Sequence, residues 1–136
     1  MLRRDAKIDL LKRVPLFANC SKAELGSIAL LADELDLPEG KVVTTEGDPG
    51  REFFVLVEGT ADVRRKGRKV NAMSAGDFFG EIALVSNRPR TATVTATSPL
   101  HVLVVTDRAF RELMRKMPSI QSKVLAVLAE RCPTDD

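Results

Sequence analysis

The segment Phe78–Val94 reads FFGEIALVSNRPRTATV and places Glu81 and Arg90 among apolar and small residues. Its GEIAL portion suits a single helical turn between strands, and Gly80 has no Cβ, so a ligand can approach the backbone closely. The amides at the start of such a turn are donors without helical partners. Arg90 follows Pro89 and offers a planar guanidinium that can bind two oxygens of a phosphate. The segment therefore predicts a site for a phosphate-like anion.

The carboxylate of Glu81 cannot share that role, because it has the same sign of charge as a phosphate. It suits a hydroxyl donor beside the phosphate, such as a sugar 2′-hydroxyl, while the hydroxyl of Thr91 can reach the phosphate or a base edge. In the simpler alternative, Glu81 and Arg90 form an internal salt bridge or lie in solvent. A buried ion pair gains little over apolar packing, so an external anion explains the arrangement better.

Short apolar runs separated by turns surround this segment, a pattern typical of antiparallel strands. Several short strands at this spacing predict an α+β fold with an antiparallel, jelly-roll-like β-roll that removes most sheet edges. The expected strands are Lys41–Thr45, Phe53–Glu58, Thr60–Arg65, Lys69–Ser74, Ala92–Thr97 and Leu100–Thr106.

Helical spacing occurs on both sides of the expected roll. Ser21 and Glu24 can form a capping box, which predicts a helix from Lys22 to about Ala32. The length of 136 residues favours one domain, residues 1–136. We expect N-terminal helices within about 5–37, the roll within about 40–106 and C-terminal helices within about 107–132. The other expected helices are Asp5–Val14, Asp107–Met117 and Ser119–Cys132, the last with an apolar stripe at Ile120, Val124, Leu125, Leu128 and Cys132.

Composition and charge are those of an ordinary globular protein, with 44% hydrophobic and 29% charged residues and a net charge of +2. No apolar run approaches the roughly 18 residues that span a bilayer, so we expect a cytoplasmic protein without a membrane span. Basic and acidic residues mostly alternate, except at Arg64–Lys69. We interpret that run first as a solvated hairpin tip, with a contact to an acidic partner or an anionic surface as the alternative.

The sequence offers no pattern for catalysis or metal binding. Cys20 and Cys132 lack CxxC spacing and are expected to be reduced thiols. The single histidine, His101, lies in an apolar run and is expected to be a partly covered strand residue. A metal-dependent enzyme built on a similar roll needs several histidines, and no nucleophile stands beside a base. We therefore expect no catalytic residue, no metal and no cofactor.

Two motifs, Phe79–Leu84 and Pro89–Val94, together resemble the phosphate-binding cassette of cyclic-nucleotide-binding domains. Such domains occur in regulatory subunits of cyclic-nucleotide-dependent kinases, in cyclic-nucleotide-gated channels and in the catabolite activator protein. The resemblance covers most of the chain, because four other motifs also look like the family's helix, roll and turn pattern: Val14–Phe17, Glu46–Asp48, Phe53–Gly59 and Ala75–Asp77.

The resemblance implies a regulatory module that holds cAMP or cGMP in the roll and signals by movement of the C-terminal helix. It implies that Arg90 pairs with the cyclic phosphate, that Glu81 accepts from the ribose 2′-hydroxyl, and that amides around Gly80, Ile82 and Ala83 complete the phosphate cradle. The implied ligand-binding residues are Phe79, Gly80, Glu81, Ile82, Ala83, Arg90, Thr91 and Ala92.

The choice of nucleotide and the partners follow from the same likeness. In the family, a hydroxyl residue after the arginine, here Thr91, is associated with acceptance of cGMP, yet we expect cAMP because it is the commoner ligand of stand-alone members. Direct DNA binding is not expected, whereas a protein effector and a homodimer stay open. A domain that keeps the fold as a protein-interaction scaffold without a ligand is the alternative, against which Gly80, Glu81 and Arg90 count.

Overall fold

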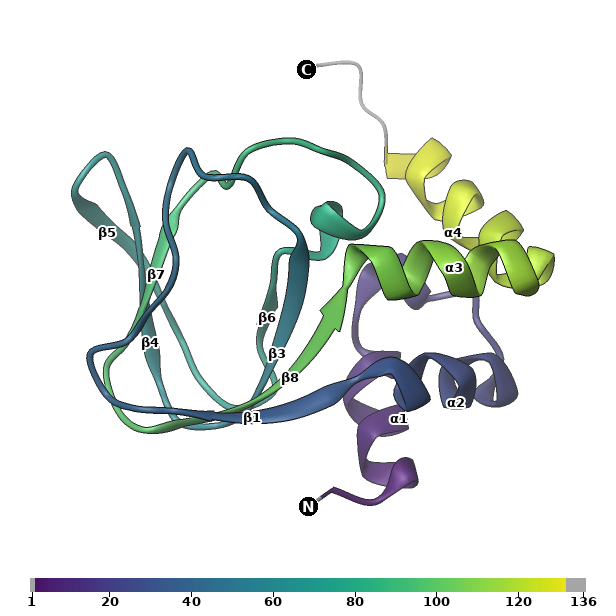
Figure 1. Ribbon diagram of the computed structural model, residues 1–136, viewed down its shortest axis with the longest axis horizontal. Coiled ribbons are helices and arrows are strands. Elements are labelled where there is room, and N and C mark those ends of the chain that lie inside the picture. Colours follow the sequence, from purple (N-terminus) through teal and green to yellow (C-terminus); the bar gives the residue numbers. More distant parts are fainter. Residues whose placement is uncertain (1, 132–136) are drawn as a thin grey trace. The chain divides into compact units, whose positions relative to one another are not determined.

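Helices and strands form two compact units in the computed structural model, which describes residues 2–131 (Figure 1). One unit comprises Met1–Ala32 with Ala109–Asp136, and the other comprises Asp33–Arg108. The chain thus follows the expected order of helices, roll and helices, and the α+β fold class is confirmed.

The first unit is helical, and proline and capping residues define where its helices begin. The predicted capping box is present, since Ser21 Oγ accepts from the Glu24 amide at 3.1 Å and Glu24 Oε1 accepts from the Ser21 amide at 2.7 Å. Prolines open two of the elements, where a missing N–H is tolerated. The helices are α1 (Arg4–Lys12), the 3₁₀ helix η1 (Pro15–Phe17), α2 (Lys22–Leu31), α3 (Asp107–Lys116, most of which lies in this unit) and α4 (Pro118–Arg131).

The core of the helical unit joins residues from its N-terminal and C-terminal parts. The rings of Phe17 and Phe110 are tilted against each other, with centroids 5.5 Å apart. The predicted stripe of α4 is right for Ile120 and Val124, which are buried, and wrong for Leu125, which is 56% exposed. Val127 is buried instead, because it is three residues after Val124 on the same helical face. Cys132, the last residue of the predicted stripe, lies outside the described residues.

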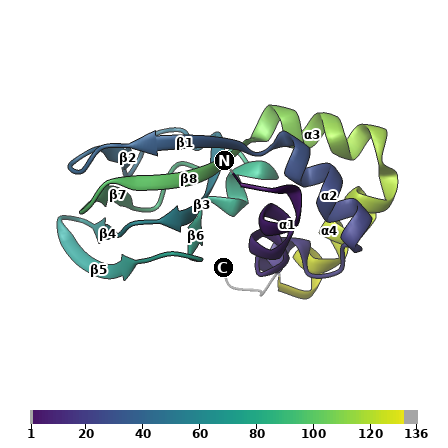
Figure 2. The ribbon, with the colours of Figure 1, turned by 90° about the horizontal axis from the view of Figure 1, so that it is seen from below.

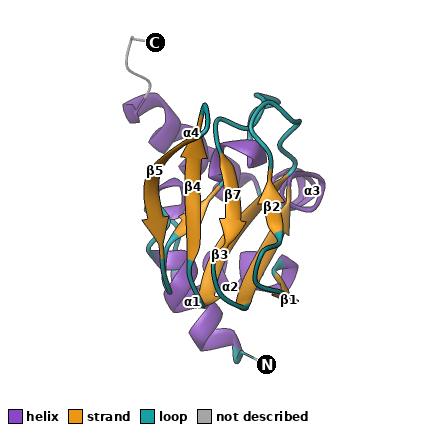
Figure 3. Ribbon diagram, turned by 90° about the vertical axis from the view of Figure 1, so that its left-hand side faces the viewer, coloured by secondary structure: helices purple, strands orange, loops and turns teal. Residues whose placement is uncertain are grey.

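The second unit is a roll of two antiparallel four-stranded sheets, with strand orders β1-β8-β3-β6 and β2-β7-β4-β5. Figure 3 shows the second sheet face on, with β5 at its edge. The strands are β1 (Asp33–Leu37), β2 (Val42–Thr44), β3 (Glu52–Glu58), β4 (Ala61–Arg65), β5 (Arg68–Met73), β6 (Phe78–Phe79), β7 (Thr93–Ala96) and β8 (Leu100–Thr106).

Two strands depart from the sequence-based expectation. Residues 33–37, expected within the N-terminal helices, form β1, which lies beside β8 (Figure 2) and pairs with it from Asp33↔Val104 to Leu37↔Leu100. The chain leaves the helical conformation at Ala32, whose ψ is 116°. The short strand β6 was not expected either, and it pairs with β3 through Phe54↔Phe79 and Val55↔Phe78. Pairing with strands that are distant in the sequence therefore determines the conformation of both segments.

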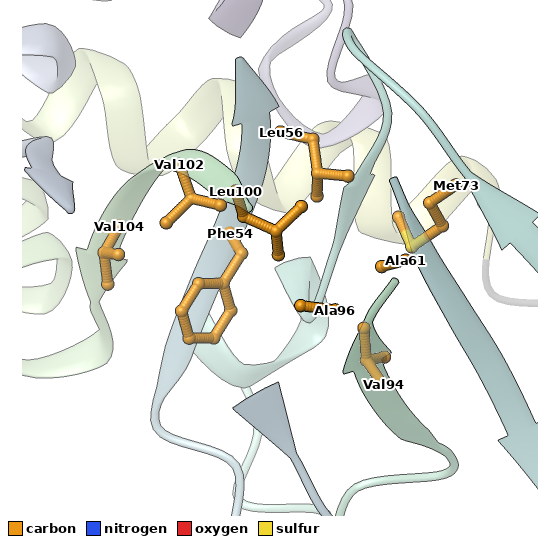
Figure 4. Close-up of a cluster of buried hydrophobic side chains, with 9 residues drawn as sticks. All are labelled: Phe54, Leu56, Ala61, Met73, Val94, Ala96, Leu100, Val102 and Val104. Atoms are coloured by element: carbon orange, nitrogen blue, oxygen red, sulfur yellow. The ribbon is translucent and has the colours of Figure 1, made fainter. Parts of the chain in front are cut away.

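Side chains from both sheets fill the interior of the roll (Figure 4). The cluster consists of Phe54, Leu56, Ala61, Met73, Val94, Ala96, Leu100, Val102 and Val104. Truncating a fully buried member such as Leu56 to alanine is expected to cost about 2–5 kcal/mol. This core fixes the positions of β3 and β7. The segment that contains the candidate site, residues 80–92, lies between these two strands in the sequence.

Candidate functional site

The first part of the site is the turn that follows β6. Gly80 has a φ of 82° and precedes the 3₁₀ helix η2 (Glu81–Leu84), as predicted for a helical turn at GEIAL. The Ala83 amide donates to the Gly80 carbonyl at 3.0 Å, so this amide of the expected phosphate cradle already has a partner within the turn. Ala83 and Leu84 are buried, and Ile82 is 39% exposed. The apolar residues of η2 therefore anchor the turn, and Gly80 supplies the left-handed conformation.

The second part of the site is Arg90, whose backbone is held by the Gly47–Asp48 turn. The Arg90 amide donates to the Asp48 carbonyl at 2.8 Å, and the Gly47 amide donates to the Arg90 carbonyl at 2.8 Å. A β-bridge between Pro49 and Pro89 lies beside these bonds. The two loops therefore form a short ladder that fixes where the arginine side chain begins.

The side chain of Arg90 is only 9% exposed. Its Nη2 donates to the main-chain carbonyl of Glu52 at 2.8 Å and lies 3.5 Å from Glu52 Oε1. Burial lowers the pKa of Arg90, and the carboxylate of Glu52 opposes that shift. Arginine remains charged at any physiological pH. The site thus contains a cation whose side chain is largely buried and whose contact with the Glu52 carboxylate is long.

Gly80 in the turn and Arg90 in the following loop lie next to each other, although nine residues separate them in the sequence. A Cβ placed on Gly80 would lie 2.4 Å from Arg90 Nη1 and 2.7 Å from the Glu52 carbonyl. A Cβ on Gly50 would lie 3.1 Å from Arg90 Cδ. The guanidinium therefore rests directly on the glycine backbone, and the predicted approach of a ligand to Gly80 stays a prediction.

Two phenylalanines complete the surroundings of Arg90. The Arg90 Cζ lies 5.9 Å from the centroid of the Phe54 ring, within the range of a cation–π contact. The Phe54 ring stacks on Phe79, with centroids 4.9 Å apart and planes 16° from parallel. Phe79, one of the expected site residues, therefore supports Arg90 through Phe54.

The remaining expected residues lie on the same two loops. Glu81 is half-buried and Thr91 is exposed. Ala92 is half-buried, and its carbonyl accepts from Thr44 Oγ1 at 3.4 Å. Sequence reasoning missed Glu52, because the group that Arg90 contacts most closely is its main-chain carbonyl, which no side-chain pattern reveals.

Away from this site, hydrogen bonds and burial shift pKa values in both units. In the roll, His101 Nδ1 lies 2.7 Å from Asp36 and Nε2 lies 2.8 Å from Glu34, and these hydrogen bonds raise the pKa of the imidazole. In the helical unit, burial raises the pKa of the Cys20 thiol. Within residues 2–131 no group of His, Cys, Asp and Glu is arranged to hold a metal ion. No described helix has the length and apolar character needed to cross a membrane.

Comparison with protein families gives a match to the model described as cyclic nucleotide-binding domain, over residues 34–117. The chain is 39% identical to a cAMP-dependent protein kinase regulatory subunit of Mycosarcoma maydis, over 87% of this chain and 24% of the relative. It is 38% identical to a cGMP-dependent protein kinase of Toxoplasma gondii, over 82% of this chain and 11% of the relative. The chain thus spans about a quarter or less of these relatives.

Solved structures give the same picture of the fold. The N-terminal domain of a transcriptional regulator from Streptomyces coelicolor A3(2) superposes with a TM-score of 0.82 at 28% identity, covering 91% of this chain and 92% of that one. A structure described as cAMP bound PfPKA-R superposes with a TM-score of 0.69 at 26% identity, covering 97% of this chain and 48% of that one.

Proposed function

This chain belongs to the cyclic nucleotide-binding domain family, and from this premise we propose that it binds a cyclic mononucleotide whose phosphate contacts Arg90. The observation that carries the proposal is the close packing of Arg90 Nη1 on the backbone of Gly80, at 2.4 Å from where a Cβ would stand. A buried guanidinium of this kind is costly without an anion, and its contact with the Glu52 carboxylate is 3.5 Å long. A cyclic phosphate supplies the missing charge.

In this proposal, the other residues of the two loops contact different parts of the ligand. Glu81 accepts from the ribose 2′-hydroxyl, and the amides of Gly80 and Ile82 donate to phosphate oxygens. Ala83 contributes its buried methyl group and the fixed turn, because its amide already donates to Gly80. Phe79, Thr91 and Ala92 border the ligand on the remaining sides.

We propose that cAMP is preferred over cGMP. The relatives are named for both, since one is a cAMP-dependent kinase subunit and another a cGMP-dependent kinase. Thr91 is exposed, so its hydroxyl is accessible to a base edge. If the hydroxyl contacts the guanine amino group, Thr91→Ala should weaken the binding of cGMP more than the binding of cAMP.

The proposed role is regulatory. Ligand binding shifts the population of conformations of the C-terminal helices α3 and α4, and an unidentified protein effector responds to that shift. The regulatory-subunit relatives support this role by their names. A single domain, a cytoplasmic location, the absence of direct DNA binding and a possible homodimer all stay predictions.

A second candidate is a scaffold of the same fold that has no ligand and acts through protein contacts. One observation favours it: Arg90 already donates to the Glu52 carbonyl at 2.8 Å, so the roll satisfies part of the guanidinium with its own backbone. The two candidates differ in whether an external anion binds.

Calorimetric titration distinguishes them. The protein is unfolded and refolded to remove co-purified nucleotide, then titrated with cAMP, with cGMP and with the uncyclised 5′-AMP. The proposal expects saturable binding of one cAMP per chain, weaker binding of cGMP and the weakest binding of 5′-AMP. Titrations without heat for both cyclic nucleotides, on a sample whose circular dichroism shows it to be folded, would contradict it and support the scaffold.

A further inference from the structure

The excess positive charge of this chain is concentrated in the hairpin of β4 and β5. Residues 62–69 contain five basic side chains and one acidic, a net charge of +4, whereas the whole chain carries +2, so the rest of the chain is at −2. All five basic side chains are exposed. The turn is tight, because Lys66 and Gly67 both have positive φ, at 51° and 79°, which is the two-residue hairpin geometry. The basic residues therefore lie at and beside the tip of this hairpin. Figure 2 shows the two strands of the hairpin, β4 and β5.

The basic residues on the two faces of this tip differ in whether an acidic side chain lies near them. Arg64 is opposite Lys69 and Arg65 is opposite Arg68, so the first pair shares one face and the second pair the other. Asp62 lies 3.7 Å from Arg64 and 3.2 Å from Lys69, which neutralises part of the first face. Within the described residues, neither Arg65 nor Arg68 has an acidic partner. Like charges directly opposite each other are destabilising. Within residues 2–131 no ion pair offsets the Arg65 and Arg68 pair, and the carboxylate at the turn, Glu46 Oε1, accepts from the Lys66 amide at 2.8 Å.

The same hairpin contains a free sheet edge. In the strand order β2-β7-β4-β5, the strand β5 is last, so within residues 2–131 its outer main-chain groups are not paired with another strand (Figure 3). The first five residues of β5 are exposed, including Val70 at 52%. A free edge can accept an added strand, and alternate side-chain contacts then give specificity. Basic residues on the edge oppose pairing with a second copy, which would have the same charges.

We propose that the β5 edge and the basic tip bind an extended acidic segment of a partner protein, which adds as a strand to β5. Its main chain pairs with the outer edge of Arg68–Met73, and its carboxylates contact the arginines Arg65 and Arg68. An acidic peptide strand would contact both the outer edge of β5 and the basic residues of the tip. Nucleic acid or an anionic membrane would use the charge alone, and residues 62–69 contain no aromatic side chain for base stacking.

Fluorescence anisotropy tests this surface with the full chain and a short fluorescein-labelled peptide of alternating glutamate and valine. Binding is expected, and the double variant Arg65→Ala, Arg68→Ala should raise Kd at least about tenfold. The control variant Lys12→Ala, Arg13→Ala removes the same charge from exposed positions of the helical unit and should leave Kd unchanged. A peptide of equal charge with proline in place of valine, which cannot pair as a strand, should bind at least about tenfold more weakly.

Three results would overturn the proposal. One is an equal loss of affinity in the two double variants, and another is equal affinity for the proline peptide, which would indicate unspecific charge attraction. The third is tighter binding of duplex DNA or of phosphatidylserine vesicles with the same dependence on Arg65 and Arg68, which would assign the tip to those surfaces. Unchanged circular dichroism and an unchanged Tm in the variants would show that the roll remains folded.

Discussion

The guanidinium of Arg90 donates a hydrogen bond of 2.8 Å to the main-chain carbonyl of Glu52, which ties the loop after η2 to the beginning of β3. A main-chain acceptor stays in place whatever side chain occupies position 52. The arginine is therefore oriented by the protein's own main chain, and such preorganisation would reduce the entropy lost on binding the proposed ligand.

The side chain of Glu52 should accordingly matter little for the position of Arg90. It is 46% exposed and lies 3.5 Å from the guanidinium. We expect Glu52→Gln to change the free energy of unfolding by less than about 1 kcal/mol. The affinity for cAMP should stay equal or rise slightly, because a negative charge near the phosphate is removed. Urea denaturation and calorimetry check both values, and a large loss of affinity would show that the carboxylate orients Arg90.

Gly80→Ala should damage both stability and ligand binding. The new Cβ would lie 2.4 Å from Arg90 Nη1 and 2.7 Å from the Glu52 carbonyl, in a backbone with a φ of 82°. Gly40→Ala is the matched control, because Gly40 has a φ of 89° with nothing within 4 Å of the added Cβ. Both variants should lose about 1–3 kcal/mol of stability from backbone strain. Only Gly80→Ala should also displace Arg90 and weaken cAMP binding, and equal affinities in the two variants would contradict this account.

Glu24 should make the helical unit sensitive to acid. Glu24 is buried, and its carboxylate accepts from Lys123 Nζ at 2.6 Å and from Ser119 Oγ at 2.6 Å. The hydrogen bond from Lys123, followed by those from Ser119 and Ser21, lowers the pKa of Glu24 from 4.5 to about 2. Because the folded pKa is the lower one, this stabilisation is complete above pH 4.5 and is lost as the pH falls from 4.5 toward 2.

Lys123→Met tests this contribution of Glu24. At neutral pH it should lower the free energy of unfolding by about 1–3 kcal/mol, because a buried acceptor loses its charged donor. Its stability should also fall less steeply in acid than that of the wild type. The control is Lys22→Met, which removes an exposed lysine at the beginning of α2. Identical acid dependence in the two variants, measured by urea denaturation at several pH values, would show that Lys123 does not shift the pKa of Glu24.

His101 should make the stability of the roll depend on pH in the opposite direction, with stability lost as the pH rises. Hydrogen bonds with Asp36 first and Glu34 second raise the pKa of the imidazole above 6.5. Since the folded pKa is the higher one, the stabilisation is complete below pH 6.5 and is lost as the pH rises through the folded value. His101→Gln can hydrogen-bond but does not titrate, so it should flatten the dependence of Tm on pH between about pH 5 and pH 9. An unchanged dependence in this variant would exclude His101 as its source.

The features predicted correctly from the sequence are those encoded by neighbouring residues. Ser21 and Glu24 form the capping box with side chains three positions apart, and the Gly80 turn requires only a residue that tolerates positive φ. Arg90 was predicted to serve the same site as Gly80 from their types and from the resemblance to a known cassette. The structure brings the two residues together, and their roles toward a ligand stay predictions.

The features missed depend on contacts between distant residues. The segment DELDL of β1 has no β-branched residue and follows two helical leucines, so its local preference favours a continued helix. Pairing with β8, more than sixty positions later, overrides that preference. The role of Glu52 was also hidden, since its carbonyl meets Arg90 across 38 positions of sequence.

The most direct test of the central claim is a calorimetric cAMP titration of Arg90→Ala beside Arg88→Ala. Arg88 is an exposed arginine of the same loop, so the pair separates the specific contact from the loss of one positive charge. We expect Arg90→Ala to lose about 2–5 kcal/mol of binding free energy, because the buried phosphate loses its paired charge, and Arg88→Ala to bind like the wild type. Glu81→Ala should lose less, about 1–3 kcal/mol, as for a hydrogen bond to a charged group. Equal affinity of Arg90→Ala and wild type would contradict the account.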